Sequence, residues 1–201
     1  MANRMDEITQ IYMPPRDAIR RLSQEGLVRG LDDAKLDALR AECWDDSEEE
    51  MEDAGVLGIL TSFYEGVERG LEDGFVWRGA QFWNDTDDVV AEISAALKID
   101  PPLYRQRSAR ETVSHGANRQ AVLALELERA DGEVQLVEAR SLRDVVDVFN
   151  AELKRRDQTR RLIALDTSGE WEMFIATDLR LARKLFAEGA LPVHDVEQLG
   201  E

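Results

Sequence analysis

Cysteine and histidine are nearly absent from this sequence: its 201 residues include one cysteine, Cys43, and two histidines. A single cysteine cannot form an internal disulfide, and these three side chains are too far apart in the chain to match a zinc-ligand spacing. The neighbouring pair Ser114-His115 does not indicate a catalytic triad, because adjacency in sequence does not place a hydroxyl against an imidazole. We therefore expect no disulfide, no zinc site and no nucleophilic catalysis.

Long apolar runs are also missing, since no stretch of about 18 apolar residues occurs. The first ten residues, MANRMDEITQ, lack the basic-then-apolar order of a secretory signal. Of the 25 basic residues 21 are arginine, a skew that we interpret as the mark of a GC-rich bacterial genome. We expect a cytoplasmic bacterial protein with no membrane partner.

The sequence motifs of common enzymes are missing as well. There is no G-x-S-x-G, no G-x-G-x-x-G and no G-x-x-x-x-G-K-[ST]. A calcium loop that begins at Asp45 or at Asp85 would lack both the glycine and the final glutamate that such loops need. These absences favour a non-catalytic protein without a cofactor. The alternative that stays open is a divalent-metal-dependent hydrolase or phosphoryl-transfer enzyme that uses Asp85, Asp87 or the acids of residues 45–53.

Negative charge, in contrast, is abundant and concentrated in one third of the chain. The net charge is −17, and residues 31–100 hold 20 acidic and five basic residues, a balance of −15. Such a field repels nucleic acids and anionic lipids, and it attracts and orients a cationic partner. Solubility alone is the simpler explanation. On the first interpretation we expect a basic protein partner and no nucleic-acid partner.

The first hundred residues show helical periodicity and helix-ending signals. Helices are predicted from Pro14-Pro15 to Gly26, from Asp32 or Asp33 to about Trp44, from Ser47 onward, and from Thr86 to about Lys98. In the second of these helices Cys43 shares an apolar face with Leu36 and Leu39, so we expect it to be buried. The apolar stripe of the third is Val56, Leu60, Phe63, Val67 and Leu71.

The segment CWDDSEEEMED, residues 43–53, carries seven carboxylates between the second and third predicted helices. Ser47 and Glu50 match a capping box, in which the hydroxyl accepts from the Glu50 amide and the carboxylate accepts from the Ser47 amide. Four other acids of the third helix are not needed by this local structure as specific ligands. We therefore predict that they contact a partner: Glu48, Glu49, Glu52 and Asp53.

Aromatic residues gather in the segment FVWRGAQFWND, residues 75–85, which aspartates border on both sides. Burial in the core is the simplest interpretation, because large aromatics dominate protein cores. Tryptophans ringed by acids are also typical of binding sites for basic proteins. On that second interpretation the partner-binding residues of this region are Trp77, Trp83, Asp85 and Asp87.

The last hundred residues change character. Residues 101–119 are rich in arginine and weakly periodic, which predicts a linker or long loop with at most a short helix after Ser108. From residue 120 the pattern alternates in the order ββαββα, with turns at Asp131-Gly132 and at Thr167-Ser168-Gly169. We predict an α+β fold: a helical region (1–100), a linker (101–119) and a ββαββα region (120–201) with an antiparallel sheet and helices on one face. The two regions form separate domains or one continuous domain.

An acidic α+β protein of this kind, without catalytic residues, is similar in general character to the immunity proteins that neutralise secreted toxins, many of them basic nucleases. The preferred hypothesis is therefore an immunity-type inhibitor that occludes a basic toxin or enzyme. The other open hypothesis is a regulatory or scaffold module that binds a peptide or a small ligand. An apolar pocket between the two regions would favour that module. The sequence does not indicate an oligomeric state.

Overall fold

The computed structural model describes residues 12–64, 69–79, 89–113, 121–167 and 171–200. The helices are α1 (Pro15–Gln24), α2 (Asp33–Cys43), α3 (Glu48–Tyr64), α4 (Arg69–Asp73), α5 (Val89–Leu97), α6 (Leu142–Arg155), α7 (Leu179–Ala187) and the 3₁₀ helix η2 (Val196–Leu199). The strands are β1 (Phe75–Gly79), β2 (Tyr104–Val113), β3 (Ala121–Arg129), β4 (Val134–Ala139), β5 (Arg160–Ala164) and β6 (Trp171–Asp178). The predicted α+β fold is confirmed.

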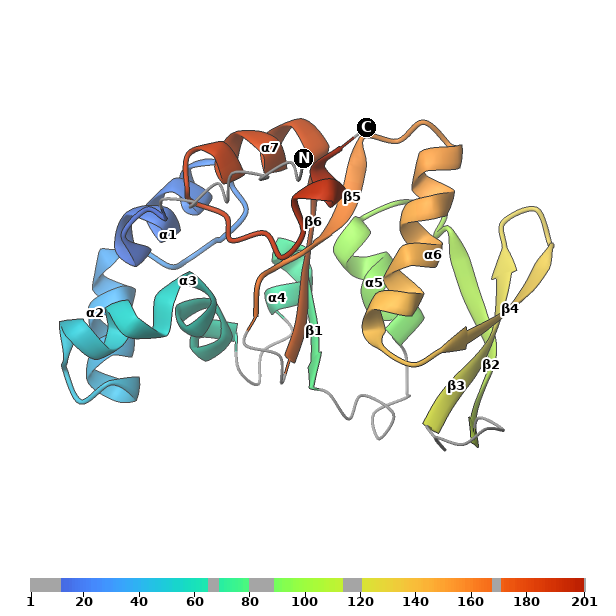
Figure 1. Ribbon diagram of the computed structural model, residues 1–201, viewed down its shortest axis with the longest axis horizontal. Coiled ribbons are helices and arrows are strands. Elements are labelled where there is room, and N and C mark those ends of the chain that lie inside the picture. Colours follow the sequence, from blue (N-terminus) through green and yellow to red (C-terminus); the bar gives the residue numbers. More distant parts are fainter. Residues whose placement is uncertain (1–11, 65–68, 80–88, 114–120, 168–170, 201) are drawn as a thin grey trace, which may run out of the picture.

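These strands form two antiparallel sheets of three strands, in the orders β1-β6-β5 and β2-β3-β4. Helices α1, α2, α3 and α7 lie on one side of the first sheet, and α5 and α6 lie between the two sheets (Figure 1). The ββαββα order is confirmed, and its strands are divided between the two sheets. Each sheet is completed by one strand that precedes residue 120: β1, from the predicted helical region, joins the first sheet, and β2, from the predicted linker, joins the second.

The first sheet is buried on both faces because alternate residues of its strands enter two different cores. Phe75 and Ile175 pack with the α1–α3 and α7 side, whereas Val76 and Phe174 pack with α5 and α6. The second sheet packs its inner face against α5 and α6, as predicted for a sheet with helices on one face. Its outer face is open, and Leu136 on β4 is 64% exposed there.

Local signals predicted the N-terminal helices well. Helix α1 is followed by Gly26, whose φ of 72° lies in the left-handed region that glycine adopts readily. Asp32 caps α2 by accepting a hydrogen bond from the Lys35 amide at 2.9 Å. The predicted start of α5 at residues 86–88 and the predicted stripe residue Val67 lie outside the described residues.

The predicted burial of Cys43 is wrong, because its side chain is exposed. Cys43 is the last residue of α2, and the chain then turns through Asp45 and Asp46, which both have positive φ. Trp44 packs against the core instead. Helical periodicity alone does not show that the core ends before the final turn of the helix.

The predicted linker is also wrong for its central part, since residues 104–113 form the edge strand β2. A register shift between Gln106 and Ser108 interrupts the alternation of buried and exposed residues that identifies a strand. Arg105, Arg107 and Arg110 are exposed on this strand, and charged side chains are common on sheet edges that must not pair with other chains. The arginines that suggested a loop therefore belong to an edge strand.

Candidate functional site

The start of α3 is capped by Ser47, as predicted, but through only half of a capping box. The Ser47 hydroxyl accepts a hydrogen bond from the Glu50 amide at 3.2 Å. The Ser47 amide donates to the Trp44 carbonyl at 2.7 Å, not to the Glu50 carboxylate. The Glu50 side chain is thus left exposed on the surface of α3.

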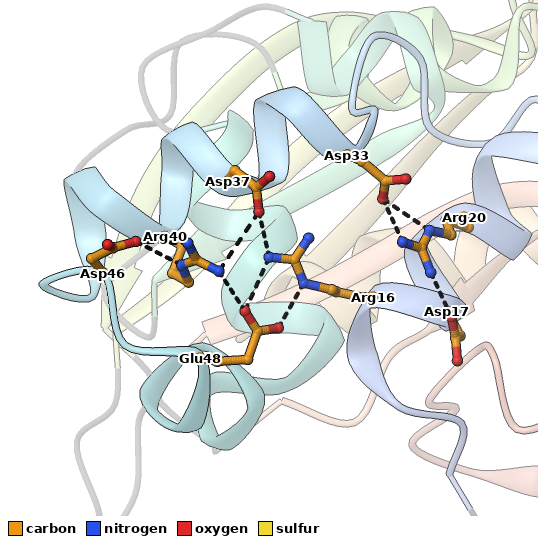
Figure 2. Close-up of polar contacts among 8 residues, drawn as sticks. All are labelled: Arg16, Asp17, Arg20, Asp33, Asp37, Arg40, Asp46 and Glu48. Atoms are coloured by element: carbon orange, nitrogen blue, oxygen red, sulfur yellow. Dashed lines mark hydrogen bonds and ion pairs between the residues drawn. The ribbon is translucent and has the colours of Figure 1, made fainter.

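Glu48 is held inside the protein's own network of ion pairs, which Figure 2 shows. Arg16 of α1 donates to one carboxylate oxygen at 2.6 Å, and Arg40 of α2 donates to the other at 2.7 Å. The hydrogen bonds from Arg16, and then those from Arg40, lower the pKa of Glu48 to about 2. Arg16 and Arg40 also contact Asp37 and Asp46. The interpretation that local structure does not need Glu48 is therefore wrong.

The other three predicted acids of this segment are exposed on α3: Glu49, Glu52 and Asp53. Among the residues that the structure describes, none of the three has an ion-pair partner. Glu49 precedes Glu52 and Asp53 by three and four residues, which places all three on one side of the helix. These three carboxylates differ in this respect from Glu48, which is paired with Arg16 and Arg40.

A hollow of about 610 Å³ begins beside Glu52 and Asp53. Helix α3 bends at this point because Gly55 has a φ of 66° and a ψ of −176°, a conformation that is almost restricted to glycine. The walls of this hollow are formed by residues from both the N-terminal and the C-terminal half of the chain. They are Tyr12 to Pro15, Glu52 to Leu57, Asp166 and Pro192.

A second hollow of about 430 Å³ continues from the first, because Ala54, Leu57 and Asp166 line both. Three tryptophans line it: Trp44 after α2, Trp77 on β1 and Trp171 on β6. The remaining lining residues are Gly58, Thr61, Ser62, Thr167 and Met173. We call the two hollows together the aromatic groove.

Trp77 is held in this wall by the pairing of β1 with β6 and by its contact with a glycine of α4. Trp77 lies opposite Met173 in the β1–β6 ladder, so Trp171, two residues away on the same face, is its diagonal neighbour. The Trp77 ring packs against Tyr64 with ring centroids 6.1 Å apart. It also covers Gly70, where an added Cβ would lie 2.2 Å from the ring. Trp77 therefore contributes to the core with its inner part and to the groove with its outer part.

The carboxylate between the two hollows belongs to Asp166. Its side chain is about half exposed, and it lies 3.5 Å from Nδ1 of His194. Burial, together with the charge of Asp166, raises the pKa of Tyr12, which also lines the first hollow. Neither hollow is lined by an arginine or a lysine among the described residues. The groove thus combines aromatic walls with acidic borders.

The sequence-based predictions for this site have mixed outcomes. Phe75 is fully buried, which agrees with the core interpretation, and Trp77 reaches both core and groove. Trp83, Asp85 and Asp87 lie outside the described residues. Sequence reasoning missed Trp44, Trp171 and Asp166, because no local signal brings three distant segments together. The signal that was available is the strand pattern predicted for EWEMFIAT, residues 170–177, because side chains two residues apart in a strand, such as Trp171 and Met173, lie on one face.

A further hollow, of about 650 Å³, lies between α6, β5 and η2, and its charges are mixed. Arg143, Lys154 and Arg161 line it together with Asp147 and Glu197. Burial raises the pKa of Asp147. Because both signs of charge occur there, this hollow favours no particular charged ligand.

Two other findings concern metal ions and membranes. In the described ranges, no three His, Cys, Asp or Glu side chains converge closely enough to hold a metal ion. Within the same ranges, no helix combines the length and the apolar character needed to cross a bilayer.

The fold and the groove define an α+β protein with an aromatic and acidic surface groove. Comparisons with protein-family models, with curated proteins and with solved structures find no match to this chain.

Proposed function

We propose that this protein is a non-catalytic binding protein that holds a basic surface of a partner protein in its aromatic groove. The observation that carries the proposal is the conjunction of three tryptophans with Glu52 and Asp53, which have no ion-pair partner in the described part of the chain, along one continuous groove. Tryptophan is enriched among the residues that dominate binding energy at protein interfaces. Carboxylates around such anchors select a basic partner by charge complementarity.

The distribution of charge supports the same proposal. Residues 31–100 carry a balance of −15, and α3 lies within them. A field of this size accelerates association with a cationic protein, and added salt reduces the acceleration. Glu48 is paired with Arg16 and Arg40, so of the four acids predicted on α3, Glu49, Glu52 and Asp53 remain for a partner.

In its specific form, the proposal is an immunity-type inhibitor in the bacterial cytoplasm. Such a protein acts by occlusion, because a bound acidic surface covers the basic residues with which a toxin contacts its own target. A secreted basic toxin or enzyme is the partner that fits, and this mode of action requires no catalytic residue. Proteins of this kind must bind quickly, which is the benefit of a strong field of one sign.

The test uses the product of the gene adjacent to this one, where the partner of an immunity protein is expected. Co-expression should yield a complex of the two proteins and suppress the toxicity of the neighbouring product. Reversing two groove charges, E52K with D53K, should weaken the complex and restore toxicity. The matched control is E111K with E138K, which changes the net charge equally on the second sheet, far from α3 (Figure 1).

Two outcomes would contradict the proposal. One is a neighbouring product that is neither basic nor bound by this protein. The other is a complex that E52K with D53K weakens no more than the control pair does. In the second case the total charge, not the groove, would account for binding.

A second candidate function has one specific observation in its favour. The aromatic groove lies between the two halves of the chain, since Tyr12 and Glu52 line it together with Asp166 and Pro192. A pocket between the two regions is what a module that binds a peptide or a small ligand requires. That module would bind a short basic peptide in isolation, whereas an occluding inhibitor needs the folded surface of its partner.

A further inference from the structure

The part of the groove that the three tryptophans line has the features of a subsite for a single cation. We infer that this hollow accepts the guanidinium group of an arginine side chain of the partner. The inference rests on the proposed function and makes it more specific, because it names the group that anchors the partner. Its walls are aromatic, its border carries a carboxylate, and none of its described lining residues is an arginine or a lysine.

The walls come from three elements that the fold holds in fixed positions. Trp44 follows α2, Trp77 lies on β1, and Trp171 lies at the start of β6. Trp77 is fixed by its contacts with Tyr64 and Gly70, whereas Trp171 is 48% exposed. The faces of indole rings attract cations more strongly than those of other aromatic side chains, and arginine is the more frequent partner.

The border supplies one carboxylate. Asp166 lines the hollow, and its carboxylate lies 3.5 Å from Nδ1 of His194. A guanidinium can donate to a carboxylate with one edge while its flat face lies against an aromatic ring. The ammonium of lysine has no flat face, so the arrangement favours arginine.

Within the described ranges, no arginine or lysine lines the hollow, although the chain is rich in arginine. Among the described residues, every side chain that lines it is apolar, aromatic, hydroxylic or acidic. Its volume of about 430 Å³ lies within the range of roughly 300–1,000 Å³ that is typical of pockets for small ligands. The pocket is therefore large enough for one side chain and is not neutralised from within.

The test compares two probes of nearly equal shape, N-acetylarginine amide and N-acetylcitrulline amide, of which only the first is charged. Each is titrated into the full-length protein, and the indole N–H resonances and tryptophan fluorescence are followed. We expect arginine to bind about three-fold to ten-fold more tightly than citrulline. W171L should remove this preference, and D166N should reduce it. L136A, which removes an exposed apolar side chain on β4, is the control and should retain it.

Equal affinity for the two probes would overturn the inference, and so would a W171L variant that folds normally and still prefers arginine. Circular dichroism of W171L shows whether it folds; if it does not, D166N makes the same comparison with all three indoles intact. A separate experiment tests the proposed function: the effect on the protein complex of E52K with D53K, two substitutions that border the other hollow. If that pair weakens the protein complex while the probes bind equally, the binding function stands and the arginine subsite is wrong.

Discussion

Arg16 holds Glu48 with two parallel hydrogen bonds, from Nε to Oε1 at 2.6 Å and from Nη2 to Oε2 at 3.0 Å. This bidentate geometry is the strong form of an arginine–carboxylate pair. It joins the first turn of α1 to the first residue of α3, where a negative charge also meets the positive end of the helix dipole. A carboxylate that the sequence assigns to a partner thus stabilises the packing of the N-terminal helices.

The pH dependence of stability follows from this pair. The pKa of Glu48 is about 2 in the folded protein, below its ordinary value of 4.5. Because the folded pKa is lowered, the stabilisation is complete above about pH 4.5 and is lost as the pH falls toward 2. We expect E48Q to lower the free energy of unfolding at pH 7 by about 1 kcal/mol, since Glu48 is partly exposed. Urea unfolding at pH 7 and at pH 3 measures both effects.

The matched control for that experiment is E49Q, which removes a neighbouring carboxylate that has no ion-pair partner among the described residues. The two variants should differ clearly at pH 7, and the difference should be smaller at pH 3, where part of the stabilisation from Glu48 is lost. If E49Q costs as much stability as E48Q, the ion pairs with Arg16 and Arg40 do not stabilise the fold.

Substituting Glu152 on α6 should lower the stability of the protein more than substituting Glu48 does, because the Glu152 side chain is only 1% exposed. Arg155 and Arg156 donate to it at 2.6 and 2.7 Å, and the hydrogen bond from Arg155 is the main reason why its pKa falls to about 2 despite burial. We expect E152Q to lower the free energy of unfolding by about 2 kcal/mol, because a neutral amide loses the charge-assisted hydrogen bonds from Arg155 and Arg156. Chemical denaturation measures the loss. E138Q, at an exposed position on β4, should change stability by less than about 0.5 kcal/mol.

The contact between Gly70 and Trp77 predicts the effect of adding one methyl group. A Cβ at residue 70 would lie 2.2 Å from the Trp77 ring, which must then move. We expect G70A to lower the free energy of unfolding by about 1–3 kcal/mol and to change the tryptophan fluorescence spectrum. A G70A protein with wild-type stability and spectrum would show that the ring does not cover Gly70.

Much of the fold could be predicted because its signals are local. The cap formed by Asp32, the left-handed Gly26 and the turn at Asp131-Gly132 each act within a few residues, so the sequence shows them directly. Strand β2 could not be predicted in this way. Its register shift after Gln106 breaks the period of two, and its exposed arginines are also common in loops.

The aromatic groove was less predictable, since it depends on contacts between distant segments. Trp44, Trp77 and Trp171 lie far apart in the sequence, and only the packing of α2, β1 and β6 brings them together. The acids of residues 43–53 look alike in the sequence. The structure separates them, because Glu48 faces Arg16 and Arg40 whereas Glu52 and Asp53 face the groove.

We propose that the acids of the groove, and not the total negative charge, hold a basic partner. The most direct measurement is the affinity of a nine-arginine peptide for the wild-type protein, for E52K with D53K, and for E111K with E138K, at low and at high salt. We expect E52K with D53K to weaken binding of the peptide by about five-fold or more, roughly 1 kcal/mol, and to flatten the salt dependence of binding. The control pair should change the affinity by less than about two-fold. If the two pairs of substitutions weaken binding equally, the total negative charge, and not the acids of the groove, holds the peptide.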